Sequence, residues 1–338
     1  MPELRMNQAI REALAHEMRA DPSVLILGED VAAADGVFKA TEGLLAEFGP
    51  LRVRDTPISE TAILGAAVGA AMAGMRPVAE IMFVEFLGVA LDQIVTQAAK
   101  MHYLSAGVFS VPLVVRASAG AGLGFGAQHS QTLETWLLST PGLKVASPSG
   151  PLSAYRLLRA AIRDPNPVVI LEPRALYGVR ETFDPDSVVV DRLGIARKVH
   201  HGDAVTVVAL GQMVRLASSA AASVADRWPA DLWDLETLLP WDRASILESV
   251  RRTGRLIVVE ENPSTGGWGT EVVSYLAERA WSSLKAPPVR ICCPDTPVPF
   301  AGKLERRYLP SETSVADQIK ALCTDGRRLT PWWEVHAP

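Results

Sequence analysis

Residues 60–86 read ETAILGAAVGAAMAGMRPVAEIMFVEF, and this stretch decides the class of fold. Its first part is apolar and rich in Gly and Ala, which predicts a helix that begins at Glu60, and residues 77–86 then predict a strand. Further apolar runs predict strands of the same kind, at residues 24–28, 111–118 and 167–174. Strands that alternate with helices indicate a parallel sheet covered on both faces. We therefore expect an α/β fold.

The second half of the chain repeats this alternation. Strand-like runs at 204–211, 255–262 and 289–295 alternate with helical patterns, whereas residues 175–202 are polar and irregular. A chain of 338 residues also exceeds the usual size of a single hydrophobic core. We expect three parts: a first domain over 1–185, a second domain over 186–325, and a tail over 326–338.

Composition excludes several classes of protein. With 33 basic and 38 acidic residues the net charge is −5, which argues against a nucleic-acid partner. The three cysteines have no C-x-x-C spacing, so a reducing, cytoplasmic location is expected. The N-terminus has no signal-peptide pattern, and the apolar run at 61–75 is shorter than the ~20 residues that a membrane span needs. We expect a soluble protein, and we interpret residues 61–75 as a buried helix.

Glu60 is the first candidate for a functional residue. Ser59 can cap the helix, and an acid in the first turn interacts favourably with the helix dipole, which would be a purely structural role. The helix behind it, however, carries Gly65 and Gly69 one turn apart, so another backbone or a rigid ligand can approach it closely. A carboxylate on a tightly packed helix has the rigidity that a functional site needs.

His129 is the second candidate, and it follows a glycine-rich stretch. Residues 122–127, GLGFGA, satisfy a relaxed dinucleotide-binding pattern, but that fold needs an acid about 20 residues further on, and none occurs between Glu134 and Asp164. A nicotinamide oxidoreductase is therefore disfavoured. His129 fits either a loop histidine satisfied by backbone and water or a general acid–base.

Other common sites are missing from the sequence. No G-x-S-x-G or P-loop motif is present, and no His, Cys or carboxylate pair has metal-ligand spacing. The residues alone indicate an α/β protein of two domains with candidate groups at Glu60 and His129, and they leave the reaction open.

Several collinear motifs resemble one family, the β subunit of the thiamine-diphosphate-dependent first component of 2-oxo acid dehydrogenase complexes. The similarity runs from about residue 5 to 320. The motifs are LGEDV (27–31), GVFKAT (36–41), DTPISE (55–60), AQHSQ (127–131), PGLKV (141–145), NPVV (166–169), GRLIVVEE (254–261) and PDTPVPFA (294–301). The resemblance implies a transketolase-like architecture: two three-layer α/β/α domains with mostly parallel sheets, a pyrimidine-binding domain followed by a C-terminal domain.

The resemblance also implies roles for particular residues. Glu60 would hydrogen-bond a ring nitrogen of the cofactor's aminopyrimidine, which favours the tautomer that activates the thiazolium, and Phe86 would stack on that ring. His129 would face the active-site channel and assist acyl transfer to a lipoyl disulfide as general acid–base. A structural potassium ion would lie near Leu113, Ala161, Asp164 and Asn166.

The resemblance implies partner chains, because family members divide the cofactor site between two kinds of subunit. Family members hold the diphosphate through magnesium on a GDG…N motif of a separate α subunit, and no GDG occurs in this sequence. The resemblance thus implies a heterotetramer of two α and two β chains, which docks on a dihydrolipoyl acyltransferase core. The substrate would be a small 2-oxo acid or acetoin.

Two features depart from the family pattern, and the exact activity stays open. DLETL places Glu236 where a base is usual, and the tail with Trp332 and Trp333 extends past the usual end. The loop over 122–134 favours pyruvate- or acetoin-type chains. The alternatives are a branched-chain 2-oxo acid dehydrogenase β subunit and a non-catalytic transketolase-like scaffold protein.

Overall fold

The computed structural model describes residues 1–335, which divide into two compact units. The first unit comprises 1–119, 136–193 and 237–240, and the second comprises 120–135, 194–236 and the residues from 241 onward. The segment 120–135, which the sequence places within the first domain, thus belongs to the second unit.

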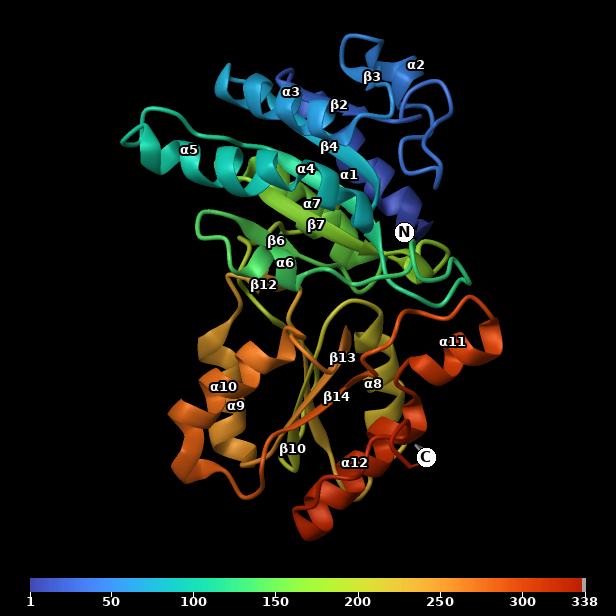
Figure 1. Cartoon of the computed structure of the whole chain (residues 1–338), viewed down its shortest axis with the longest axis vertical. Coiled ribbons are helices and arrows are strands. Elements are labelled where there is room, and N and C mark those ends of the chain that lie inside the picture. The colour runs from blue at the N-terminus through green and yellow to red at the C-terminus, as the bar shows by residue number, and fades with distance from the viewer. Residues whose placement is uncertain (336–338) are drawn as a thin grey trace. The chain divides into compact units, whose positions relative to one another are not determined.

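The first unit is built on a seven-stranded sheet of order β12-β6-β7-β5-β4-β2-β3, in which only β12 is antiparallel to its neighbour. Its strands are β2 (Val24–Gly28), β3 (Val53–Asp55), β4 (Arg76–Phe83), β5 (Val114–Ala119), β6 (Lys144–Ala146), β7 (Val168–Pro173) and β12 (Thr237–Leu239). Its main helices are α1 (Met6–Ala20), α3 (Glu60–Met72), α4 (Leu87–Asp92), α5 (Ala99–Leu104) and α7 (Pro151–Arg163), with short α2 (Leu44–Phe48) and α6 (Thr135–Leu138) (Figure 1). Two further strands, β1 (Glu3–Arg5) and β8 (Arg180–Thr182), are far apart in the sequence and pair with each other as a separate antiparallel ladder.

Both faces of this sheet are covered. Val78, Val114 and Val168 lie opposite one another in register and belong to a core cluster shared with α1 and α7. The strand residues between them point to the other face, where Ile63 and Leu64 of α3 are buried. This is the near-continuous apolar strand pattern of a parallel sheet with helices on both sides.

A buried ion network crosses the middle of the first sheet. Arg116 on β5 is 1% exposed; its guanidinium donates to Glu80 on β4 (2.6 Å) and makes a two-pronged contact with Glu172 on β7 (2.7 and 2.9 Å). Tyr177 donates to Glu172 as well (2.7 Å). Burial opposes the charge on Arg116, but the two carboxylates outweigh it and raise the pKa of the guanidinium; burial raises the pKa of Glu80. Three neighbouring strands are thereby tied through side chains as well as backbone.

The second unit has a five-stranded sheet of order β14-β13-β10-β11-β9, parallel except for β9. Its strands are β9 (Arg197–His200), β10 (Val205–Ala209), β11 (Ala230–Asp234), β13 (Leu256–Pro263) and β14 (Val289–Cys293). Its helices are α8 (Gln212–Ala222), α9 (Arg243–Thr253), α10 (Gly269–Ala280), α11 (Gly302–Tyr308) and α12 (Glu312–Asp325). Helices α8 and α12 share a core cluster with one face of this sheet, and α9 packs with α10 (Figure 1).

The expected fold class is confirmed, and the differences from the sequence predictions are local. Helices α4 and α5 are joined by a π-helical stretch, Gln93–Ala98, where the Thr96 hydroxyl donates to the Asp92 carbonyl (2.8 Å) and competes with the backbone. The helix behind Glu60, expected to be buried, is buried on one face only: Ile63 and Leu64 are buried, whereas the small residues Ala62, Ala66 and Gly69 are exposed. Several elements were not predicted from the sequence: strands β1, β3, β6, β8, β9, β11 and β12, and helices α2, α6, α11 and α12.

The Arg116 network predicts a strong stability effect. Arg116→Ala leaves two carboxylates buried without their counter-charge, so we expect the free energy of unfolding to fall by about 3–5 kcal/mol. Urea unfolding followed by circular dichroism measures this. The matched control is Arg180→Ala, which removes an exposed arginine from its pair with Glu3, with side chains 53% and 54% exposed. We expect that loss to be ~1 kcal/mol or less; equal effects of the two variants would contradict the role given to Arg116.

Candidate functional site

The candidate residues of the first unit gather at the carboxyl edge of its sheet. Glu29 directly follows β2, Glu60 follows β3 after a short turn, and Phe86 follows β4. Strands β2, β3 and β4 are parallel neighbours, so their carboxyl ends meet at one edge. The Thr56 amide donates to the Gly28 carbonyl (3.0 Å) and holds the turn before Glu60 against the end of β2. In open parallel sheets this edge is where ligands bind.

Glu60 is the first residue of α3 and is buried, at 9% exposure. Ser59 occupies the N-cap position, but its side chain makes no capping hydrogen bond. The capping role that the sequence suggests for Ser59 is therefore absent. Behind Glu60, the side chain of Gln93 approaches Gly65, whereas no atom lies within 4 Å of a Cβ built on Gly69. The small-residue face of α3 therefore remains open over part of its length.

Glu29 is an acidic neighbour of Glu60 that the sequence analysis did not single out. Burial raises the pKa of Glu29, and the charges of Glu60 and Asp30 raise it further. A carboxyl group whose charge is disfavoured by burial and by a neighbouring acid is common where a proton must be held or moved. The signal for Glu29 was present in LGEDV, an acid placed directly after a buried strand.

Phe86 belongs to an aromatic cluster. Its ring packs edge-on against Phe83 with centroids 5.8 Å apart, and Phe38 packs on Phe83 (6.1 Å) and on Tyr177 (5.1 Å). The guanidinium of Arg174 lies over the Phe83 ring at 4.9 Å. Since Tyr177 bonds Glu172, the cluster connects Phe86 to the buried ion network, which fixes the position of the half-buried ring.

His129 lies in the second unit, on a closed loop that follows β5. The Gly120 amide donates to the Gln131 carbonyl (2.9 Å), and the His129 amide donates to the Gly126 carbonyl (3.3 Å). The imidazole is half-buried. Glu60 and His129 thus stand on different compact units, each on its own supporting structure.

Side chains of the second unit hold this loop at three points. Glu261 on β13 accepts from the Ala121 amide (2.5 Å), Glu305 on α11 accepts from two glycine amides, and Asn262 donates to the Thr132 carbonyl (3.2 Å) and to Glu134 (2.8 Å). Bonds to charged groups contribute about 1.5–3 kcal/mol each. Glu261, Asn262 and Glu305 were not predicted from the sequence, because they lie 128 to 183 residues away from the loop residues that they contact.

The contacts of Glu305 also argue against the dinucleotide-binding interpretation of the glycine-rich loop. Gly122 donates to its carboxylate at 2.8 Å and Gly124 at 3.0 Å, so these glycine amides already serve an internal anion. After the loop comes α6, a helix of only four residues. A pyrophosphate site needs free amides at the start of a helix, so this loop does not have the arrangement of a nicotinamide-binding fold.

The residues expected near potassium gather at the opposite, amino edge of the first sheet. Leu113 precedes β5, while Ala161, Asp164 and Asn166 precede β7. The Leu113 carbonyl accepts from Val168 (2.9 Å) and the Ala161 carbonyl from Asp164 (3.2 Å), which leaves each oxygen a second lone pair. The Asp164 carboxylate pairs with Lys144 and accepts from Asn166. A cation there would be held mainly by backbone carbonyls, the ligand type that potassium prefers.

Glu236, the departure from the family pattern, is buried in the turn between β11 and β12. It is 2% exposed with a left-handed φ of 54°, its amide donates to Asp234 (3.0 Å), and Arg197 lies 3.6 Å from its carboxylate. Its observed contacts are therefore internal to the second unit. Among residues 1–335 no group of three His, Cys, Asp or Glu side chains is placed to hold a metal ion, and no helix is long and apolar enough to span a membrane.

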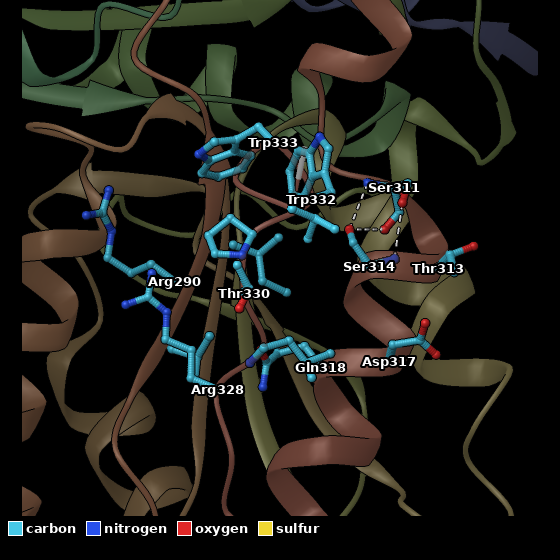
Figure 2. A pocket seen from close by; sticks show the side chains of 15 residues that line it. Arg290, Ser311, Thr313, Ser314, Asp317, Gln318, Arg328, Thr330, Trp332 and Trp333 are labelled. Atoms are coloured by element: carbon cyan, nitrogen blue, oxygen red, sulfur yellow. Dashed lines mark hydrogen bonds between the residues drawn. The ribbon is translucent and has the colours of Figure 1, made fainter. Parts of the chain in front are cut away.

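The tail after α12 is packed and borders a cavity of about 300 Å³ (Figure 2). The Gln318 side chain bonds the Arg327 carbonyl (2.9 Å) and the Leu329 amide (2.9 Å), and the Trp332 indole donates to the Arg307 carbonyl (2.7 Å). Trp332 and Trp333 stand edge to face, 4.4 Å apart. None of the predicted site residues lines this cavity. Residues 336–338 of the predicted tail lie outside the described residues.

Comparison with known proteins identifies the class. The chain matches the transketolase pyrimidine-binding domain over residues 2–180 and the transketolase C-terminal domain over residues 194–315. Its fold is similar to that of a solved split-gene transketolase, described as an inactive β4 tetramer, with a TM-score of 0.77 and 25% identity over 96% of this chain and all of that one. The chain is a transketolase-like protein.

Full-length relatives narrow this to a family. The chain is 42% identical to the pyruvate dehydrogenase E1 component subunit beta of Rhizobium meliloti, over 96% of this chain and 70% of that one. It is 43% identical to the acetoin:2,6-dichlorophenolindophenol oxidoreductase subunit beta of Cupriavidus necator, over 96% and 98% of the two chains. The chain belongs to the family of β subunits of the thiamine-diphosphate-dependent first component of 2-oxo acid dehydrogenases, which confirms the resemblance seen in the sequence.

The raised pKa of Glu29 predicts a pH-dependent cost in stability. The folded protein holds the Glu29 proton more tightly than the unfolded chain, so stability falls as pH rises from the unfolded pKa through the folded one. Glu29→Gln cannot ionise. We expect its melting temperature to match the wild type near pH 4 and to exceed it at pH 8, measured by scanning calorimetry.

The matched control for that experiment is Glu42→Gln, which alters an exposed carboxyl group in the same loop region. We expect its melting temperature to stay close to the wild type. A Glu29→Gln protein that is less stable than the wild type at pH 8 would contradict the repulsion between Glu29 and Glu60.

Proposed function

We propose that this chain is the catalytic β subunit of a thiamine-diphosphate-dependent dehydrogenase of the pyruvate or acetoin type. The assembled enzyme decarboxylates a small 2-oxo acid, or cleaves acetoin, and reductively acylates the lipoyl group of an acyltransferase. The observation that carries this proposal is Glu60, a buried carboxyl group at the start of α3, next to Glu29 and near a fixed aromatic cluster, in a chain of this family.

Glu60 and Phe86 would act on the cofactor's pyrimidine ring. Bound thiamine diphosphate supplies an electron sink for the carbanion that decarboxylation generates. The Glu60 carboxyl group would hydrogen-bond a ring nitrogen and hold a proton there, and Phe86 would lie against the ring face. Glu29 suits this role for Glu60, since a second acid beside it provides a place for the proton.

His129 would act on the acyl group that leaves the site. The ends of the His129 loop are joined by a hydrogen bond, which holds the imidazole in place. Such an imidazole is a suitable general acid–base for transfer of the acyl group to a lipoyl disulfide. The relatives described above are named for pyruvate or acetoin. Their names support those substrates for this chain over branched-chain 2-oxo acids.

Partner chains would complete the site. The absence of GDG from the sequence supports an α subunit that holds magnesium and the diphosphate, in an assembly of two α and two β chains. Large apolar side chains of the first unit are exposed, as expected of surfaces that become buried in an assembly; examples are Ile58 (83%), Tyr103 (86%) and Val108 (77%). The second unit would dock on the dihydrolipoyl acyltransferase core, and potassium would bind at the amino edge near Leu113 and Ala161 as a structural ion.

A non-catalytic scaffold is the second candidate, and one comparison bears on it. The similar split-gene transketolase is described as an inactive β4 tetramer. This chain retains Glu60 and His129, which favours catalysis once a suitable partner is present.

The decisive experiment uses the assembled enzyme. The chain is co-expressed with an α subunit of the pyruvate- or acetoin-type family, and turnover of pyruvate, acetoin and a branched-chain 2-oxo acid is followed by dye reduction with added thiamine diphosphate and magnesium. Glu60→Gln keeps the size of the side chain but cannot supply its proton, so we expect kcat to fall by about 10²–10⁴-fold. Glu42→Gln is the control. Wild-type turnover in Glu60→Gln would remove the mechanism.

His129 gives a separate prediction about the second half of the reaction. His129→Ala lowers the rate of acyl transfer to a lipoyl domain by about 10²-fold, while dye-coupled turnover, which bypasses that transfer, falls much less. The ratio of the two rates in one preparation measures the effect. An equal loss in both assays would assign His129 to the decarboxylation step instead.

A further inference from the structure

We infer that Glu305 is a positioning residue for His129, acting as an internal anion bound by the backbone amides of the glycine-rich loop. This inference rests on the proposed function of His129. Glu305 lies on α11, 176 residues after His129 in the chain, and neither the family motifs nor the sequence analysis gave it a role.

The loop backbone forms a concave anion site around the Glu305 carboxylate. One oxygen accepts from the Gly122 amide (2.8 Å) and the Gly124 amide (3.2 Å), and the other accepts from Gly124 (3.0 Å). Gly122 and Gly124 have φ values of +109° and +70°, where side chains are strained. Successive amides that converge in this way make a cavity with affinity for anions. The glycines are needed because only they let both amides point to one carboxylate.

The carboxylate is built into the protein rather than presented to solvent. Glu305 is 3% exposed, and its helix packs through Tyr308 on a small cluster with Ala121, Cys293 and Val298. Ala121 is also the loop residue whose amide donates a hydrogen bond to Glu261. Two separate acids from β13 and α11 thus hold consecutive parts of the loop.

The loop carries this restraint to the histidine over a short path. Phe300, just before α11, is 76% exposed, but one edge of its ring lies beside the loop: a Cβ built on Gly126 would lie 3.4 Å from that ring. The Gly126 carbonyl accepts from the His129 amide (3.3 Å), and the Gln131 carbonyl closes the loop onto Gly120. Loss of the anion would release amides at one end of a closed loop and allow its other end, with the imidazole, to shift.

The test removes the carboxylate and returns it as a small molecule. In Glu305→Ala holoenzyme we expect lipoyl acylation to fall by about 10²-fold, because small misplacements of a catalytic group cost that much, with little change in KM for the 2-oxo acid. Acetate matches the deleted atoms and should restore a large part of the rate, whereas sodium chloride at equal ionic strength should not. Hydrogen exchange of the Gly122 and Gly124 amides should accelerate in the variant and slow again with acetate.

Two further variants make the result interpretable. Glu305→Gln keeps one oxygen that can accept from both glycine amides but loses the charge, so its rate should lie between those of wild type and Glu305→Ala. Glu312→Ala removes an exposed acid at the start of α12 and should behave as wild type.

Wild-type acylation or unchanged loop exchange in Glu305→Ala would overturn the inference, and so would losses that acetate leaves uncorrected in both measurements. Failure of the proposed function looks different. The wild-type holoenzyme would then lack lipoyl acylation altogether, while the exchange measurement would still report whether Glu305 orders the loop.

Discussion

The contact between Arg116 and its two carboxylates is the interaction on which the first unit depends. A guanidinium at 1% exposure is stable only because Glu80 and Glu172 flank it on neighbouring strands. Through Tyr177 the same network supports the aromatic cluster that contains Phe86. Fixed charges in the middle of the sheet therefore determine where an aromatic ring stands at its edge.

The second unit uses the same chemistry in another form. Glu261 and Glu305 place buried negative charge against backbone amides instead of against arginine. A loop with several glycines has high conformational freedom in the unfolded chain, and ordering it costs entropy. The bonds to carboxylates offset this cost and leave the loop in one conformation, which is what a histidine needs if it is to act at a defined distance.

Function and stability oppose each other at Glu29. Burial raises the pKa of Glu29, and the neighbouring charges of Glu60 and Asp30 raise it further. The disfavoured charge is consistent with a site that holds a proton on Glu29, at a small cost to the fold.

The sequence by itself determined the α/β class, half of the strands, and the candidates Glu60 and His129, because hydrophobic periodicity and short motifs are local properties of the chain. The candidate Phe86 came from the family resemblance. Charged residues inside otherwise apolar strands, such as Arg116 and Glu172, were visible but could not be paired. Only the tertiary structure decided that Glu305 and Glu261 hold the loop of His129, and that the loop belongs to the second unit. Such contacts join segments more than a hundred residues apart, and their geometry depends on how sheets and helices pack, which no local pattern encodes.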